Sequence, residues 1–244
     1  MRVRIFSDAE AVARALARDV ARCVARKPAL VLGLPTGRTP IPFYGELARL
    51  VRDGRLDFSR ATTFNLDEFV GLASSDRRSY RAFMQRHLFD AINLEPRRIH
   101  FLNGQARDTA RECERYERAI ARAGGIDLQI LGLGTNGHIG FNEPAPALAA
   151  RTHRTRLRPA TRRANAGLFG GRLRAVPHEA LSVGMATILY ARRIVLLATG
   201  AGKAGCVARM IEGPLTTMLP ASFLQLHRNA EAWLDRAAAA HLQR

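Results

Sequence analysis

Lysine is almost missing from this chain of 244 residues, in which Lys27 and Lys203 are the only lysines among 38 basic residues. The other basic residues are arginines, and alanine is abundant too, which is the pattern that GC-rich coding produces. The formal net charge of +17 is large enough to indicate a nucleic-acid partner. We favour the compositional explanation and expect no nucleic acid to bind, although a charge this high attracts small anions.

Cysteine is scarce as well, and its spacing excludes two classes of protein. Cys23, Cys113 and Cys206 lie far apart, are odd in number and form no Cys-x-x-Cys pair. Neither a disulfide framework nor a zinc site is therefore indicated. No other metal cluster or cofactor fingerprint occurs, so we expect no metal, no cofactor and a reducing environment.

Long apolar runs are also missing. No window reaches the roughly eighteen consecutive apolar residues that a membrane span needs. The N-terminus passes directly into an expected strand at 3–6, without the pattern of a signal peptide. We therefore expect a cytoplasmic protein with no membrane partner.

What is present is an alternation of strand and helix signals in a chain with 47% hydrophobic residues. Short apolar strands between helices are typical of a doubly wound, mostly parallel sheet with helices on both faces, a Rossmann-like three-layer α/β sandwich. The length suits a single domain over 1–244. We expect strands at 3–6, 29–34, 61–65, 99–102, 126–131 and 194–198, and helices at 8–26, 42–51, 79–88 and 108–122. The apolar runs 223–226 and 232–234 are expected to close the sheet.

The stretch 131–144 carries the strongest chemical signal. It follows the apolar run 126–131 and contains four glycines, which let the backbone turn sharply and approach a ligand closely. Into this turn the chain places His138 and, five residues later, Glu143. An imidazole and a carboxylate at the carboxyl end of a strand are what general acid–base catalysis needs. His138 alone would equally fit a tight turn whose ring bonds the backbone.

Two further turns after expected strands suit an anionic group. One offers hydroxyls and free N–H groups ahead of a helix, from Thr36, Gly37, Arg38 and Thr39. In the other, Lys203 follows a glycine turn and begins a helix, where its ammonium group would act as a point charge on a phosphate. An ordinary strand-to-helix turn is the alternative interpretation of the 36–39 turn.

Asp67 and Glu68 directly follow the expected strand at 61–65. Because neighbouring residues of an extended chain point in opposite directions, only one of the two carboxylates can face a ligand. On residue types alone, the pair also fits a helix cap or a surface pair.

The segment Gly137–Pro144 resembles the signature of the glucosamine-6-phosphate deaminase (glucosamine/galactosamine-6-phosphate isomerase) family. Three more segments match in the same order, namely Leu32–Pro40, Phe64–Gly71 and Thr199–Ala204, and the likeness runs from about Ile5 to about Leu234. The related 6-phosphogluconolactonases have a different tail after the histidine. Phe141–Pro144 therefore favours the deaminase branch.

The resemblance implies a hydrolase and aldose–ketose isomerase of amino-sugar (N-acetylglucosamine) catabolism, which converts glucosamine 6-phosphate and water to fructose 6-phosphate and ammonia. Asp67 would remove the C2 proton and return it to C1, with Glu68 in a supporting role. His138 would open the sugar ring and Glu143 would orient it. The phosphate would lie on the 36–39 turn and Lys203, and residues 145–185 would form a lid over the sugar.

The chain departs from the family pattern at two positions. Asn136 stands where many members have aspartate; we interpret it as a branch variant that fixes His138 by hydrogen bonding without adding charge. Gly167 stands where the family usually has an arginine that contacts the substrate phosphate. Arg172 and Arg174 are the nearby candidates to replace it.

Other functions stay open at this stage. They are a galactosamine-6-phosphate deaminase, a 6-phosphogluconolactonase, a sugar-phosphate-sensing module without catalysis, and nucleic-acid binding through the arginines of 151–163. The retention of Asp67, His138 and Glu143 together favours the enzyme. The sequence is compatible with either a monomer or a homo-oligomer, and it indicates no response to N-acetylglucosamine 6-phosphate, because His153 and Thr155 replace basic residues of the allosteric branch.

Overall fold

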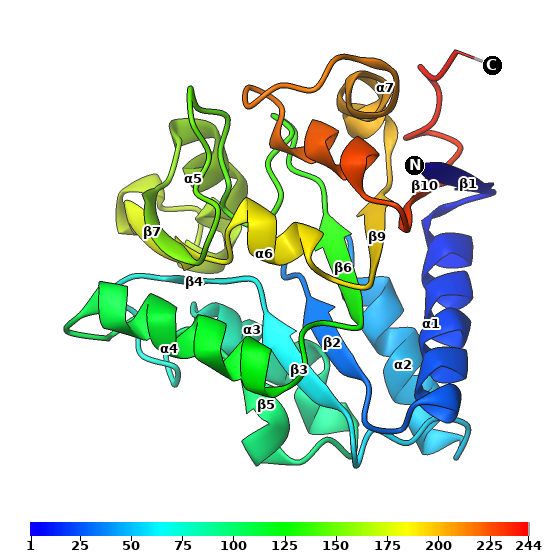
Figure 1. Ribbon diagram of the computed structural model, residues 1–244, viewed down its shortest axis with the longest axis horizontal. Coiled ribbons are helices and arrows are strands. Elements are labelled where there is room, and N and C mark those ends of the chain that lie inside the picture. The colour runs from blue at the N-terminus through cyan, green and yellow to red at the C-terminus, as the bar shows by residue number, and fades with distance from the viewer. Residues whose placement is uncertain (244) are drawn as a thin grey trace.

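A seven-stranded parallel sheet forms the centre of the computed structural model, which describes residues 1–243 (Figure 1). The strand order is β1-β10-β9-β6-β2-β3-β5, and every neighbouring pair is parallel. The strands span β1 Arg2–Phe6, β2 Val31–Leu34, β3 Thr62–Asn65, β5 Ile99–His100, β6 Leu128–Gly132, β9 Arg193–Ala198 and β10 Ala230–Asp235. The prediction of a doubly wound, mostly parallel sheet is confirmed.

Helices cover both faces of this sheet and make three layers (Figure 1). Alternate residues of the inner strands explain this, because Val195 and Leu197 of β9 pack toward one face while Ile194 and Leu196 pack toward the other. The first face carries α1 Ala9–Arg26, α2 Ile41–Arg52 and α3 Tyr80–His87, and the second carries α4 Thr109–Arg122, α6 Met185–Leu189 and α7 Ala204–Glu212. No helix within residues 1–243 combines the length and the apolar character needed to cross a membrane.

A small antiparallel sheet stands beside the large one, in the order β4-β8-β7. It is built from β4 Asp67–Phe69, β8 Glu179–Ser182 and β7 His153–Arg156. Phe69, Tyr80, Phe141 and Phe169 form an aromatic cluster beneath it. The helix α5 Pro159–Asn165 and the 3-10 helix Ala166–Phe169 lie between β7 and β8 in the chain. Much of the segment 145–185 therefore has regular structure of its own.

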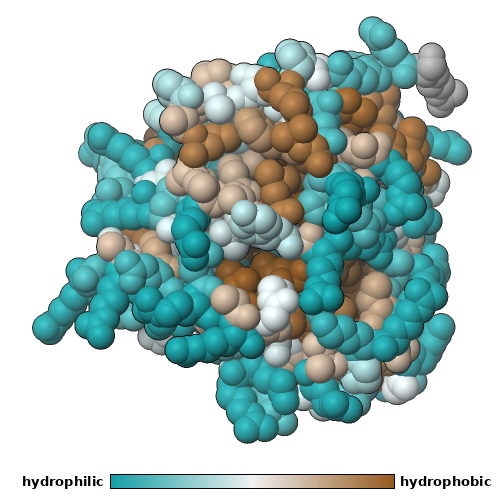
Figure 2. Space-filling model, in the orientation of Figure 1, coloured by the Kyte–Doolittle hydropathy of each residue, from teal (hydrophilic) through white to brown (hydrophobic). Residues whose placement is uncertain are grey.

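The C-terminal part corrects one expectation. The apolar run 223–226 is not a strand of the sheet but the end of the 3-10 helix Pro220–Leu226, whereas the run 232–234 does lie in β10. The 3-10 helix places Leu224 in the core and leaves Leu226 60% exposed. Figure 2 shows apolar atoms on the surface in the upper part of the view, over the segment between α7 and β10, where Leu215 and Met218 are exposed as well.

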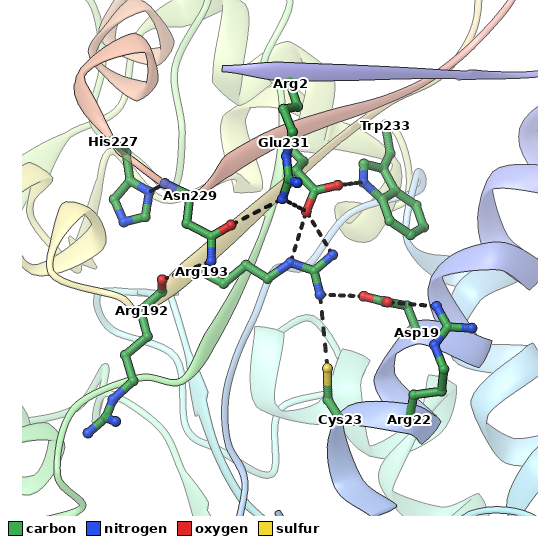
Figure 3. Close-up of polar contacts among 10 residues, drawn as sticks. All are labelled: Arg2, Asp19, Arg22, Cys23, Arg192, Arg193, His227, Asn229, Glu231 and Trp233. Carbon is green, nitrogen blue, oxygen red and sulfur yellow. Dashed lines mark hydrogen bonds and ion pairs between the residues drawn. The ribbon is translucent and has the colours of Figure 1, made fainter. Parts of the chain in front are cut away.

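The amino ends of β9, β10 and β1 meet in a partly buried charge cluster (Figure 3). Arg193 donates from Nη1 to Asp19 of α1 at 2.6 Å and from Nε to Glu231 of β10 at 3.0 Å. Glu231 also accepts from the Trp233 ring nitrogen at 3.1 Å and from Arg2 at 3.1 Å. Arg193 thus ties helix α1, through Asp19, to the amino ends of β9 and β10, through Glu231.

Removing the guanidinium of Arg193 is expected to destabilise the fold strongly. Arg193→Ala would remove a charge-assisted hydrogen bond from each of the buried carboxylates Asp19 and Glu231, which would keep only Arg22 and Arg2 as cations among residues 1–243. Losing two such bonds costs about 3 kcal/mol or more. Urea unfolding measures this. Arg192→Ala is the matched control, because Arg192 is 69% exposed and pairs with Asp127 at the surface, so it should cost less than about 1 kcal/mol. Equal losses in the two variants would contradict this role of the cluster.

Candidate active site

The turns that follow four strands of the large sheet enclose one cavity of about 760 Å³. These turns follow β2, β3, β6 and β9 at their carboxyl ends, where open parallel sheets place their ligands. Seven of the nine predicted site residues line the cavity, namely Thr36, Gly37, Arg38, Thr39, Asp67, His138 and Lys203. Asn136 and Glu143 do not line it but lie behind His138.

The turn after β6 depends on glycine at two positions. Gly137 has φ +88°, and a Cβ there would come within 2.1 Å of Leu219. A Cβ on Gly134 would lie only 2.4 Å from atoms of the His138 ring. The turn is closed by the amide of Gly134, which donates to the His138 carbonyl at 2.9 Å. The glycines therefore let the imidazole lie flat against the backbone at the cavity wall.

Behind His138, an amide and a carboxylate fix the side chain. The Nδ1 atom of His138 lies 3.5 Å from Glu143 Oε2, and Asn136 Nδ2 donates to the same oxygen at 2.8 Å. Asn136 Oδ1 accepts from the His138 amide at 3.2 Å. Burial alone would raise the pKa of Glu143, but hydrogen bonds from His138, Thr161 and Asn136 outweigh burial and lower it to about 2. Glu143 is therefore an ionised carboxylate next to the imidazole.

Among residues 1–243, Asp67 is the one carboxylate that lines the cavity. It is only 6% exposed, and its Oδ1 atom has no hydrogen-bond partner within the described residues. Burial, together with the negative charge of Glu68, raises the pKa of Asp67 to about 8, against a hydrogen bond from Thr36 that lowers it. A buried carboxyl with a free oxygen and a pKa near neutrality is suited to proton transfer.

Glu68 points away from the cavity, as alternation predicts. Its carboxylate accepts from three backbone amides, those of Phe69, Tyr80 and Arg81, each at 2.9 Å. It therefore caps the first turn of α3 and fixes the backbone next to Asp67. Burial raises the pKa of Glu68, while these three hydrogen bonds lower it.

Cations and hydroxyls also line the cavity. Tyr44 of α2 donates to the Pro35 carbonyl and so holds the turn that carries Thr36 and Thr39. Lys203 Nζ donates to the Leu133 carbonyl at 2.7 Å, which directs the ammonium group to the cavity edge. Burial lowers the pKa of Lys203. Together these groups can bind an anion such as a phosphate.

The space at Gly167 is occupied by Arg38. A Cβ built on Gly167 would lie 3.3 Å from the Arg38 Nη2 atom, and both residues line the cavity. Arg172 and Arg174, which the sequence offered as replacements for the missing arginine, do not line it. Arg38 is thus the guanidinium nearest to position 167 among these candidates.

Sequence reasoning missed several residues of the cavity wall. Tyr80, Phe83, Thr161 and Asn165 line it, although none carries a motif of its own. Phe141 lines it as well and was named only as part of the segment Gly137–Pro144. The ring of Tyr80 stacks on Phe141 with an interplanar angle of 16°. A helical pattern in residues 161–169 is the only local signal that could have brought α5 to the site.

The arginine-rich segment 151–163 is held largely by its own guanidinium groups. Arg151 pairs with Glu117, Arg154 with Glu179, Arg158 Nη2 donates to the Pro144 carbonyl, and Arg162 donates to the Val176 carbonyl. Of the arginines in this segment, Arg163 lines the cavity. Within residues 1–243, no group of three or more His, Cys, Asp or Glu side chains lies close enough to hold a metal ion.

Comparison with known proteins defines the class. Residues 7–233 match the family model of glucosamine-6-phosphate isomerases/6-phosphogluconolactonase. A solved structure of a 6-phosphogluconolactonase from Trypanosoma cruzi shares the fold, with a TM-score of 0.77 at 18% identity over 100% of this chain and 97% of that chain. The chain belongs to the glucosamine-6-phosphate isomerase/6-phosphogluconolactonase family.

More similar relatives lie in one branch of this family. The chain is 46% identical over 243 residues to a glucosamine-6-phosphate deaminase of Streptomyces avermitilis, which covers 100% of this chain and 93% of the relative. It is 48% identical to a glucosamine-6-phosphate deaminase of Hahella chejuensis, covering 100% and 92%. A solved structure described as a monomeric glucosamine-6-phosphate deaminase superposes with a TM-score of 0.95 at 41% identity, over 99% of this chain and 100% of that chain.

The raised pKa of Asp67 predicts a cost in stability. The folded chain retains a proton up to about pH 8, whereas the unfolded chain releases it near pH 4, so wild-type stability falls as pH rises between these values. Asp67→Asn carries no such group and should be the more stable protein at pH 8, with the difference disappearing toward pH 4. We expect a gain in Tm of at least about 3 °C at pH 8.

Thermal unfolding of both proteins from pH 4 to pH 8 measures this difference. Asp76→Asn is the control of opposite sign, because hydrogen bonds from Arg78 lower the pKa of Asp76 to about 2. Its stabilising effect is present above the unfolded pKa, so the Asp76 variant should lose Tm at pH 8. An Asp67→Asn protein that is less stable than wild type at pH 8 would contradict the assignment.

Proposed function

We propose that this chain catalyses the isomerising deamination of glucosamine 6-phosphate with water, giving fructose 6-phosphate and ammonia, in the catabolism of amino sugars. The observation that carries the proposal is the arrangement of Asp67 and the Glu143-oriented His138 on one cavity, in a chain whose full-length relatives are named glucosamine-6-phosphate deaminases. The reaction joins an aldose–ketose isomerisation to the hydrolysis of a C–N bond.

The phosphate of the substrate lies against the Thr36–Thr39 turn and the ammonium group of Lys203. The Thr36–Thr39 turn supplies N–H and hydroxyl donors, while Arg38 and Lys203 supply charge. A phosphate held there places the sugar ring next to Asp67 and His138. Holding the reactant in one geometry accounts for much of the rate that such a site can provide.

His138 and Asp67 act at different atoms of the sugar. His138 moves a proton from the C1 hydroxyl to the ring oxygen and so opens the ring, with Glu143 stabilising the imidazolium that forms. Asp67 then removes the proton on C2 and delivers it to C1, while a proton passes from the C2 nitrogen to the C1 oxygen. The open-chain 2-amino aldehyde thereby becomes a C2 imine with a hydroxyl on C1. Water adds to the imine carbon and ammonia leaves, giving the ketone.

The raised pKa of Asp67 fits this role. A base that takes a carbon-bound proton works best with a pKa close to the working pH. The amine on C2 is cationic when protonated, and a positive charge beside Asp67 favours its ionised form. The substrate therefore helps to ionise the base that acts on it.

A cytoplasmic location is part of the proposal. It is supported by the three cysteines, which are all free thiols, one half-buried and two buried. The proposed substrate, a small and charged sugar phosphate, is a metabolic intermediate, which also fits this location.

Replacing Asp67 is expected to abolish the reaction. Asp67→Asn keeps the shape of the site but removes the base, so ammonia and fructose 6-phosphate should both fall by at least about 1000-fold. A coupled assay measures the two products, which wild type should release in equal amounts. In wild type, kcat/KM should rise by roughly tenfold per unit up to about pH 8 and then level off, because only ionised Asp67 is active.

Activity and binding measurements with other sugar phosphates separate the alternatives. A lactonase needs no proton abstraction at C2, so an Asp67→Asn protein that keeps hydrolysing 6-phosphogluconolactone would favour that reaction. A folded wild type that binds glucosamine 6-phosphate without releasing product would favour the sensor. Greater activity on galactosamine 6-phosphate would move the assignment to the epimer.

Arg38 is expected to be the arginine that binds the phosphate. Arg38→Ala should raise KM by at least about tenfold, since hydrogen bonds to charged groups contribute about 1.5–3 kcal/mol, and it should change kcat less. The double variant Arg38→Gly/Gly167→Arg, which moves the guanidinium to the facing wall, should recover most of the affinity.

Arg172→Ala and Arg174→Ala serve as controls for this exchange, because neither residue lines the cavity. Steady-state kinetics on glucosamine 6-phosphate gives KM for all variants. A wild-type KM in Arg38→Ala together with a raised KM in either control would assign the phosphate contact to the other arginine.

A further inference from the structure

Thr161 is a residue of the cavity wall that lies next to both His138 and Glu143, which we call the acid–base pair. It is the third residue of α5 and only 2% exposed. Its Oγ1 atom lies 3.5 Å from His138 Nδ1. The Thr161 side chain also contributes, after His138, to the lowered pKa of Glu143. One hydroxyl thus faces both members of the pair.

The Nδ1 atom of His138 has two oxygen neighbours at the same distance. Glu143 Oε2 and Thr161 Oγ1 each lie 3.5 Å away, slightly beyond the 2.7–3.2 Å usual for an N–H···O hydrogen bond. A hydroxyl can accept one hydrogen bond and donate another at the same time. Thr161 is therefore placed to share the Nδ1–H with the carboxylate and to donate its own proton to that carboxylate.

The position of Thr161 is fixed from two sides. Its carbonyl accepts from Asn165 Nδ2 at 2.9 Å, and Asn165 Oδ1 accepts from the Tyr80 hydroxyl at 2.8 Å. At the start of the same helix, the Arg158 amide points at Glu143 Oε1 from 3.4 Å. The segment 158–165 thus contacts Glu143 through two donors and is tied to α3 through Tyr80.

We propose that Thr161 is a positioning residue for His138. Its hydroxyl accepts from the Nδ1–H of His138 and donates to Glu143, which holds the neutral ring in the Nδ1-protonated tautomer and leaves the Nε2 lone pair for the substrate. The proton that moves during ring opening is the one at Nε2, and Thr161 exchanges none. Because Thr161 and Arg158 belong to one helical segment, the acid–base pair is complete only when α5 covers the cavity.

Three substitutions test the proposal kinetically, and this part rests on the proposed function. Thr161→Val keeps the shape and removes the hydroxyl, and should lower kcat by about tenfold, the equivalent of one hydrogen bond, with KM nearly unchanged. Thr161→Ser should restore it. Thr187→Val is the matched control, since Thr187 is another buried hydroxyl, donates to Glu117 outside the cavity, and should leave kcat at the wild-type value.

The tautomer of His138 is a readout that requires no substrate. Nitrogen-15 chemical shifts of the imidazole, assigned with His138→Gln, should report Nδ1 protonation in neutral wild type and in Thr161→Ser. Thr161→Val should show a mixture of tautomers. This result would support the positioning role even if glucosamine 6-phosphate proved to be the wrong substrate.

A wild-type spectrum and a wild-type kcat in folded Thr161→Val would overturn the proposal. So would equal losses of kcat in Thr161→Val and Thr161→Ser with an unchanged spectrum, because packing rather than the hydroxyl would then be responsible. If no variant including wild type releases product, the spectrum alone decides for or against the positioning role of Thr161, and the proposed function fails separately.

Discussion

The parallel alignment of all seven strands is the constraint from which the site follows. Every parallel strand must be followed by a crossover, and all of these crossovers begin at the same edge of the sheet. Turns after β2, β3, β6 and β9 therefore meet in space although they lie far apart in the chain. Backbone N–H groups at this edge are free to bind an anion, because the strands have ended and the helices have only begun.

Buried charged groups at the amino ends and at the carboxyl ends of the strands differ in whether they have partners. At the amino end, Arg193 pairs with the buried carboxylates of Asp19 and Glu231 and ties elements together (Figure 3). At the carboxyl end, Asp67 has a buried oxygen without a hydrogen-bond partner among residues 1–243. Unpaired buried polar atoms cost stability. Of the buried side chains with such an atom, Asp67 is the one that lines the cavity, which fits a group whose partner is a ligand rather than the protein itself.

The sequence predicted the large sheet and the turns at its carboxyl end better than it predicted the elements of segment 145–185. Strands such as β9 are continuous apolar runs and stand out, as do glycine turns that carry His138 or Lys203. Strand β7, with the sequence His-Arg-Thr-Arg, has no apolar residue to reveal it, since it forms through pairing with β8. The 3-10 helix that contains 223–226 was mistaken for a strand because a short apolar run has no period of its own. Contacts such as Tyr80 with Asn165 join residues 85 positions apart, and no local pattern encodes them.

The space at Gly167 shows why a missing motif residue is weak grounds for inferring that a site lacks a guanidinium. A binding site requires a guanidinium near a point in space, and a side chain as long as arginine reaches that point from more than one wall. Here the absence of a side chain at 167 leaves room that Arg38 occupies. Most arginines of 151–163 are instead committed to carboxylates and carbonyls of the protein. A net charge of +17 raises the rate at which anions arrive, whereas only a few of the cations, Arg38, Arg163 and Lys203 among them, line the cavity.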